Sequence, residues 1–275
     1  METPNDPKPN PYQAPAVTVL PSDISKEATT YIPGGRTVAA AEGLEWILAA
    51  WRLFVEAPLM WIVMAVVYSV CFVVLAFVPF LGTLLACFLY VVLAVGWLAG
   101  AHAVAQGKKL EIDHLFAGFK SKTGSLLALG AFYAVASTAI VVLMIVFVAI
   151  GLGASGTIGA IMSGDTSQIA AIVGASIMTF LVALLIGLAL LAPLMAALWF
   201  APALVYFQDE SPLAALRISL IACIKNWLPF LVYGILMLVV FVIASIPFML
   251  GFLVAGPLAI ISGYTSYRAV FTEAA

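Results

Sequence analysis

The chain has 275 residues, of which 65% are hydrophobic and 9% are charged, and its formal net charge is −2. Soluble globular chains carry about 25% charged residues, so this composition excludes a soluble domain and predicts a protein that crosses a membrane several times. The small negative charge argues against a nucleic-acid partner. Because long apolar runs cross a bilayer as helices, we expect an all-α integral membrane fold.

Residues 1–38 differ in composition from the rest of the chain. They hold seven of the fifteen prolines among polar residues. Such a segment buries too little apolar surface to fold, so we expect a disordered, partly polyproline-like tail. Two roles are open for this tail, a solvated leader and a ligand for a protein partner. The first apolar run begins after residue 40 and follows acidic residues, which predicts no cleavable signal peptide. Residues 39–275 are expected to form a single six-span transmembrane domain.

The segment 211–271 is interpreted as one structural unit. Ser211 and Pro212 suit a helix start, with Asp209 and Glu210 beside the positive end of the helix dipole. A helix over 211–225 is about 22 Å long and carries two cations, so we place it in the membrane interface. A span over 230–246 follows, then a turn over 245–251 with a glycine that permits the reversal, and a returning span over 251–271 that Pro257 is expected to kink.

The same order of elements is predicted twice more. In the first copy, an amphipathic helix over 41–56 precedes spans at 57–78 and 83–106, joined by a turn at 78–82. Gly96 and Gly100 form a small-xxx-small pair, which favours close packing within the protein over dimerisation. We therefore predict six transmembrane helices and three cytosolic-side interfacial amphipathic helices in a threefold repeat.

The second copy is the least regular one. Asp113 is expected to cap a short helix that ends near residue 122, and a span at 124–151 leads to a far-side loop at 153–167. The apolar run 169–207 is almost 60 Å long as a helix, about twice the thickness of a hydrocarbon core. Two interpretations remain open: one helix kinked at Pro193 and Pro202, or a broken helix that forms two short re-entrant halves.

The distribution of cations predicts the orientation. All eleven Lys and Arg lie in the tail, the interfacial segments, their adjoining loops or near the C-terminus. The loops at 79–82, 153–167 and 247–251 hold none. Because cytoplasmic loops carry the excess of Lys and Arg, we expect both termini in the cytosol.

Residues that carry chemistry are scarce at membrane depth. His102 is interpreted as a hydrogen-bonding residue near the cytosolic end of its span, and the group Glu111, Asp113 and His114 has no recognised metal-ligand spacing. The three cysteines, at 71, 87 and 223, form no CxxC motif and read as small apolar residues. Phosphate-binding loops and catalytic motifs are missing. We therefore expect no enzyme activity, no cofactor and no metal.

The polar patch over 262–268 is the remaining candidate site. Tyr267 and Arg268 lie at the cytosolic end of the last span. Basic residues at this level can bind a lipid phosphate, which makes these two residues a candidate head-group contact. The alternative is an aromatic belt with a positive anchor.

Three groups of residues resemble an uncharacterised family of proteobacterial six-span inner-membrane proteins. The matching positions are Arg36, Gly43, Trp46, Trp51, Phe54, Pro58 and Trp61, then 113–119, then 262–271. A more distant similarity joins Ser219, Leu220, Asn226, Trp227 and Phe230 to the membrane domain of some glycerophosphodiester phosphodiesterases. The resemblance implies a bacterial inner membrane and carries no activity, because the family has no established function.

The sequence thus predicts a non-enzymatic scaffold or lipid-organising element of the inner membrane, with membrane lipids as partners. The alternative is a channel or facilitator for a small neutral solute, since spans lined by Gly, Ala, Ser and Thr need no charge. Oligomeric state, bound lipid and the partner of the tail stay open.

Overall fold

The computed structural model describes residues 29–79, 81–154 and 169–274, together with Gly156, Gly159 and Met162. In chain order its elements are β1 (Thr29–Tyr31), α1 (Glu42–Glu56), α2 (Pro58–Ala76), α3 (Leu81–Ala105), η1 (Ile112–Phe116), α4 (Ala117–Lys120), α5 (Thr123–Ala154), α7 (Ile169–Trp199), α8 (Ala201–Gln208), α9 (Pro212–Lys225), α10 (Trp227–Ser245), α11 (Phe252–Phe271) and β2 (Thr272–Ala274). The fold is all-α and of membrane type, as predicted. In the described part of the chain, five helical runs are long and apolar enough to cross a membrane: α2, α3, α5, α7 with α8, and α10.

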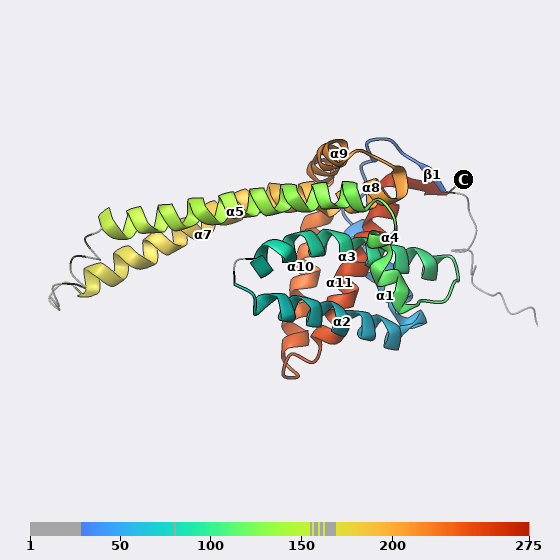
Figure 1. The fold of residues 1–275 in the computed structure, drawn as a ribbon, viewed down its shortest axis with the longest axis horizontal. Helices are drawn as coiled ribbons and strands as arrows, with labels where there is room; N and C mark the ends of the chain where they lie inside the picture. Colours follow the sequence, from blue (N-terminus) through green and yellow to red (C-terminus); the bar gives the residue numbers. More distant parts are fainter. Residues whose placement is uncertain are drawn as a thin grey trace, which may run out of the picture.

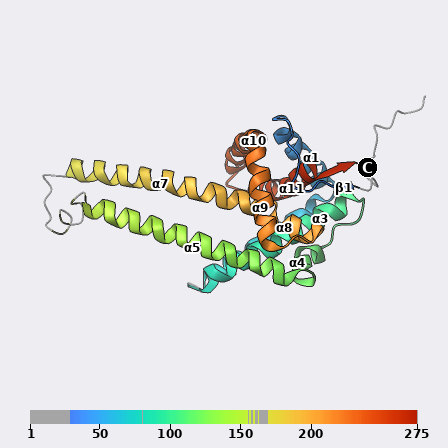
Figure 2. The same cartoon turned by 90° about the horizontal axis from the view of Figure 1, so that it is seen from above.

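The long helices form three antiparallel pairs: α2 with α3, α5 with α7, and α10 with α11. The α5–α7 pair extends far beyond the rest of the molecule in both views (Figures 1 and 2). The α10–α11 pair runs across the direction of α5 and α7 (Figure 1). The pairs therefore radiate from a shared region and do not lie parallel, as three units side by side in a bilayer would. We call this shared region the base; α1, α8, α9 and the C-terminal halves of α3 and α11 form it.

Helix α11, the sixth predicted span, lies at the centre of the base. It packs against α1, α2, α3 and α10. Ile261, Ser262, Ser266 and Phe271 on this helix have no exposed surface. Its serine and threonine side chains are enclosed by protein, so they need no contact with lipid. The same residues lower its hydropathy, and α11 is not among the five span candidates.

Aromatic side chains hold the base together. Trp61 of α2 stacks on Trp97 of α3 with ring centroids 5.6 Å apart, and its indole nitrogen donates to the Leu53 carbonyl oxygen at 2.9 Å. Phe200, at the end of α7, lies edge-on to Phe271 at 5.1 Å. Offset and edge-to-face pairs of this kind add about 0.5–1.5 kcal/mol each to the burial of the rings. They tie α1, α2, α3, α7 and α11 into one core.

The last ten residues of the predicted tail are ordered. β1 pairs antiparallel with β2, with Thr30 opposite Glu273. The Ile32 N–H donates to the Phe271 carbonyl oxygen at 2.8 Å, and the Val38 N–H donates to the side-chain oxygen of Asn226 at 2.8 Å. Residues 29–38, which we call the strap, thus find partners at the end of the chain and at Asn226, within the stretch expected to be disordered. Residues 1–28 lie outside the described residues.

Glycine serves close packing in two turns, which differs from the predicted role. A Cβ on Gly82 would lie 1.9 Å from the Leu75 carbonyl oxygen, and one on Gly251 would lie 2.5 Å from the Cα of Ala244. Each glycine contacts the residue seven positions earlier. The reversal at 245–251 uses Phe248 and Met249, whose φ angles are 48° and 64°. Phe80, in the other turn, lies outside the described residues.

The run 169–207 consists of two helices that meet at Phe200. The Phe200 N–H donates to the Ser219 hydroxyl at 2.9 Å, and that hydroxyl donates to the Ala196 carbonyl oxygen at 2.7 Å. Ser219, on α9, thus inserts into the hydrogen-bond ladder and breaks the helix. Pro202 lies in the first turn of α8, where a proline is tolerated. Pro193 lies inside α7, which continues through it. The break is therefore set by a side chain from another helix.

The second interfacial segment is shorter than its two counterparts. It folds as η1 and α4, and the residue that caps it is Glu111, not Asp113. A Cβ on Gly96 would lie 2.0 Å from the Leu115 carbonyl oxygen. The predicted use of Gly96 in packing within the protein is confirmed, with η1 as its partner. The expected loop at 153–167 falls almost entirely outside the described residues.

Candidate functional site

Arg268 lies in the last turn of α11 and lines a pocket of about 280 Å³ that also contains Arg36 and Arg52. The three arginines come from three separate parts of the chain: the strap, α1 and α11. The remaining walls are mostly small or apolar, and include Ala49, Leu53, Ala105, Tyr264, Thr265, Ala269 and Thr272. We call this site the arginine pocket. The sequence pattern identified Arg268 as a candidate site residue but did not identify Arg36 or Arg52 as part of the site.

Arg36 is anchored at the edge of the pocket. Arg36 donates from Nε to the Ala269 carbonyl oxygen at 2.8 Å, and its Nη1 lies 3.9 Å from a carboxylate oxygen of Glu273. In the described part of the chain, Arg52 and Arg268 form no ion pair. The lining of the pocket thus holds three arginines and no acidic residue, and the exposed Glu273 carboxylate lies near Arg36 alone among the three.

This charge balance favours an anion in the pocket. Like charges gathered in one place repel, and a bound anion relieves the repulsion. The guanidinium group presents planar, paired N–H donors that match the oxygens of phosphate and carboxylate groups. The pocket can therefore bind a phosphate or carboxylate by charge-assisted hydrogen bonds.

Tyr267, the other predicted head-group contact, is packed inside the base. Its side chain is 3% exposed and its hydroxyl accepts a hydrogen bond from the Gln208 amide at 2.7 Å. Its ring stacks on Phe207 and Phe271 at 5.6 and 5.7 Å. We therefore assign Tyr267 to the core. Tyr264, one turn earlier, takes its place on the pocket wall.

His102 supports that wall from α3. The Gln106 amide nitrogen lies 2.9 Å from His102 Nε2, and His102 Nδ1 lies 3.0 Å from the Tyr264 hydroxyl. If the amide donates, Nε2 must accept, and Nδ1 then carries the hydrogen and donates to Tyr264. His102 is thus a hydrogen-bonding residue that positions Tyr264.

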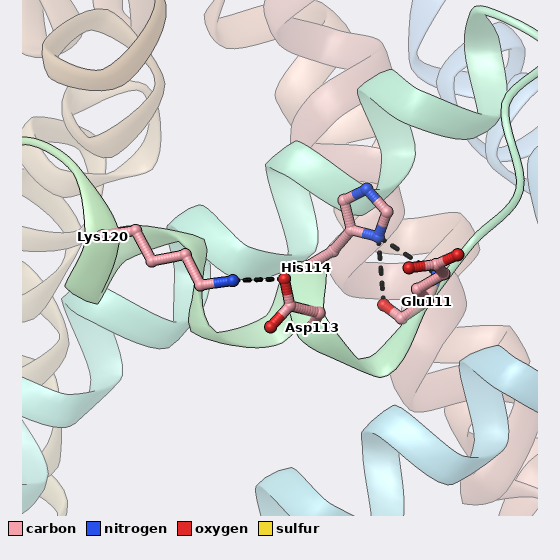
Figure 3. Close-up of polar contacts among 4 residues, drawn as sticks. All are labelled: Glu111, Asp113, His114 and Lys120. Atoms are coloured by element: carbon pink, nitrogen blue, oxygen red, sulfur yellow. Dashed lines mark hydrogen bonds and ion pairs between the residues drawn. The ribbon is translucent and has the colours of Figure 1, made fainter.

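The polar group at 111–114 splits into two separate contacts (Figure 3). The Glu111 N–H donates to His114 Nδ1 at 3.1 Å, which closes the start of η1. Asp113 pairs with Lys120, and this hydrogen bond lowers the pKa of the Asp113 carboxyl. The His114 and Asp113 side chains therefore bind different partners and do not converge on one site. Among the described residues, no cluster of three or more His, Cys, Asp or Glu is placed to hold a metal ion.

The carboxylate pair before α9 ties distant segments to the base. Asp209 ends α8 in a left-handed conformation and pairs with Lys122, while Glu210 accepts a hydrogen bond from the Tyr31 hydroxyl at 3.3 Å. Burial and the Glu210 charge raise the pKa of Tyr31 to about 12. Ser211 caps α9, as predicted. Cys223 is buried on α9, and burial raises the pKa of its thiol to about 12.

One curated relative places the chain in a family. A probable inner membrane protein of Burkholderia thailandensis is 32% identical over 203 residues, which cover 72% of this chain and 73% of the relative. The chain belongs to the family of this inner membrane protein. This membership and the apolar helices together confirm the expected multi-pass protein of the inner membrane. They also confirm the expected likeness to an uncharacterised inner-membrane family.

The other comparisons add no activity. No family model matches the chain, and no solved structure matches it. The similarity to the membrane domain of glycerophosphodiester phosphodiesterases therefore gains no support.

Proposed function

We propose that this protein is a non-enzymatic, lipid-organising element of the inner membrane and that its arginine pocket holds the head group of an anionic phospholipid. The observation that carries the proposal is the convergence of Arg36, Arg52 and Arg268 on one pocket. Basic pockets between helices on the cytoplasmic side are typical sites for acidic head groups. The pocket also joins the strap to α1 and α11, so a bound lipid would fix the base.

The proposal includes six spans with both termini in the cytosol, and α11 is the sixth span. The described hairpin ends oppose the base and carry no Lys or Arg, as the positive-inside rule requires of the far side. α5 packs on α3 as well as on α7, so crossing of one bilayer by all three pairs requires the pairs to tilt to different degrees.

A threefold repeat is part of the same proposal. The matched glycine contacts at Gly82 and Gly251 support the relation between the first and third units. The second unit departs from them in its short interfacial segment and its long helices. We further propose that the Pro-rich tail, which precedes the strap, recruits a protein partner on the cytosolic side.

Lipid retention tests the function. We would purify the wild-type protein in a mild neutral detergent, extract the bound lipid and quantify it by mass spectrometry. The test variant is Arg52→Gln with Arg268→Gln, because neither arginine has an ion pair to lose among the described residues. The matched control is Arg217→Gln, an exposed arginine on α9 outside the pocket.

We expect the wild type and the control to retain about one anionic phospholipid per chain, and the double variant to lose it. Equal retention by all three proteins would rule out the arginine pocket as a lipid site.

The competing proposal is a facilitator for a small neutral solute. Uptake of such a solute into proteoliposomes, faster than into empty vesicles and unchanged in the arginine double variant, would favour it.

A further inference from the structure

A second cavity of about 550 Å³ lies where the three helix pairs meet. Six of its lining residues are aromatic: Tyr68, Tyr90, Trp97, Trp199, Tyr233 and Phe241. We call this cavity the aromatic cleft. Its volume falls within the range of about 300–1,000 Å³ that is usual for small-molecule sites. None of its lining residues is charged.

The aromatic cleft and the arginine pocket are separate sites. Gly263 of α11 lines the cleft, and Thr265 lines the pocket. Two residues along a helix are rotated by about 200°, so the two sites lie on opposite faces of α11. An inference about the cleft therefore does not depend on the head-group proposal.

In the proposed six-span topology the cleft lies at membrane depth. Tyr90 is the tenth of 25 residues in α3, and Tyr68 is the eleventh of 19 in α2. Both positions are at least two turns from either end of their helices. At that depth, hydrocarbon offers no hydrogen-bond partner.

Two hydroxyl groups in the cleft lack a partner. The Tyr233 hydroxyl donates to the Ala259 carbonyl oxygen at 3.3 Å. The Tyr68 and Tyr90 hydroxyls donate to no acceptor in the described part of the chain, although Tyr68 lies edge-on to Trp97 at 6.2 Å. Tyr90 is 38% exposed and Tyr68 is half-buried, so their hydroxyls face the cleft or the lipid, while the buried indole nitrogen of Trp97 on the cleft wall also has no partner among the described residues. In an apolar medium a donor without a partner costs several kcal/mol, so these groups call for an acceptor from a bound molecule.

We propose that the aromatic cleft binds a neutral membrane lipid with a flat, carbonyl-bearing head group, as in a quinone. Its carbonyl oxygens accept from Tyr68 and Tyr90, and its ring packs against the aromatic walls. The uncharged lining suits a neutral ligand, because a charged group there would have no counter-ion. Leu238, at the edge of the cleft, is 63% exposed, which gives the apolar chain of the ligand a way out toward the lipid. The proposal concerns binding and includes no electron transfer.

Binding of decylubiquinone to the purified protein in detergent tests this proposal. Tyr68→Phe with Tyr90→Phe removes the two oxygens and keeps the rings. Gly234→Leu fills the cleft, since a Cβ at Gly234 would meet no atom within 4 Å. Gly174→Leu is the matched control, because Gly174 lies on α7 outside the cleft and is equally open.

The expected result is saturable binding of one quinone to the wild type and to Gly174→Leu. We expect at least a tenfold weaker affinity for the double Phe variant, since two hydrogen bonds are lost, and no binding to Gly234→Leu. Far-ultraviolet circular dichroism and melting temperature establish that each variant is folded.

Two ligands without a quinone ring sharpen the test. Decylbenzene has a ring but no carbonyl, and dioleoylglycerol has carbonyls but no ring. If either binds as tightly as decylubiquinone, or if the Phe variant binds like the wild type, the proposal is overturned.

Discussion

Helices α11 and α5 show opposite relations between polarity and burial. α11 carries three buried serine and threonine residues, Ser262, Thr265 and Ser266, and is too polar to count as a span candidate. α5 has the most apolar stretch of all the candidates, and no described residue of that stretch is buried. In α5 the described buried residues end at Ala134. The more polar helix is thus inside the protein and the more apolar one outside.

This order is the reverse of that in a soluble protein and follows from the solvent. Lipid tails are as apolar as leucine, so apolar side chains gain little by leaving them. Polar groups, in contrast, must find partners within the protein. Thr265 does so by donating to the Trp46 carbonyl oxygen at 2.8 Å. In this chain, the helix with the higher hydropathy is therefore the one exposed to lipid. Polar and small residues, in contrast, indicate which segments pack in the base.

The largest expected effect lies in the base, at Gly96. In Gly96→Ala the new Cβ would lie 2.0 Å from the Leu115 backbone oxygen, so η1 must move away from α3. Overpacking against backbone is expected to cost about 3 kcal/mol, the upper end of the usual range. Melting temperature in detergent measures it. A variant as stable as the wild type would show that α3 and η1 are not closely packed.

The next effect is expected at Asn226, which is fully buried. Its side chain accepts from the Val38 N–H at 2.8 Å and donates to the Arg36 and Ala222 carbonyl oxygens at 3.0 and 2.9 Å. Asn226→Ala leaves these groups without partners, at a cost of about 2–3 kcal/mol. We also expect faster proteolysis within residues 29–38. Unchanged cleavage there would contradict the role of Asn226 as the anchor of the strap.

Local features of the fold were predictable because they depend on neighbours in sequence. Ser211 followed by Pro212 is a helix start by itself, and the predicted helix 211–225 is α9 within one residue. The first amphipathic helix was placed equally well, since its polar stripe repeats at helical spacing.

Features that join distant segments were not predictable from local pattern. Arg52 lies on a polar stripe and is exposed, and only the packing of α1 on α11 places it on the same pocket as Arg268. Arg36 belongs to a Pro-rich stretch, and its partners lie more than 230 residues away. Ser219 breaks a helix to which it does not belong. Covariation between such positions would have been the signal.

A smaller effect is expected at high pH. The pKa of Tyr31 is raised to about 12 by burial and Glu210, from 10.0. The folded state thus favours the neutral phenol, and its contribution to stability is complete below about pH 10 and is lost as pH rises toward 12. The difference in stability between wild type and Tyr31→Phe should shrink over that window. A constant difference would contradict the contact with Glu210.

The smallest effect is expected in the projecting hairpin, at Gly174. A Cβ there would meet no atom within 4 Å. Gly174→Ala is expected to be neutral or to stabilise the protein by up to about 1 kcal/mol, through helix propensity alone. A loss of stability comparable to that of Gly96→Ala would place Gly174 in a packed interface and break the contrast between hairpin and base.

The most direct test of the arginine pocket is the melting temperature of the protein with added short-chain phosphatidylglycerol, measured in neutral detergent. A ligand that binds only the folded state at 100 times its dissociation constant stabilises it by about 2.7 kcal/mol. The melting temperature of the wild type should therefore rise with phosphatidylglycerol and stay constant with phosphatidylcholine, and that of the Arg52→Gln, Arg268→Gln variant should stay constant with both. An equal rise for both proteins, or for both lipids, would contradict the assignment of the arginine pocket as a site for anionic head groups.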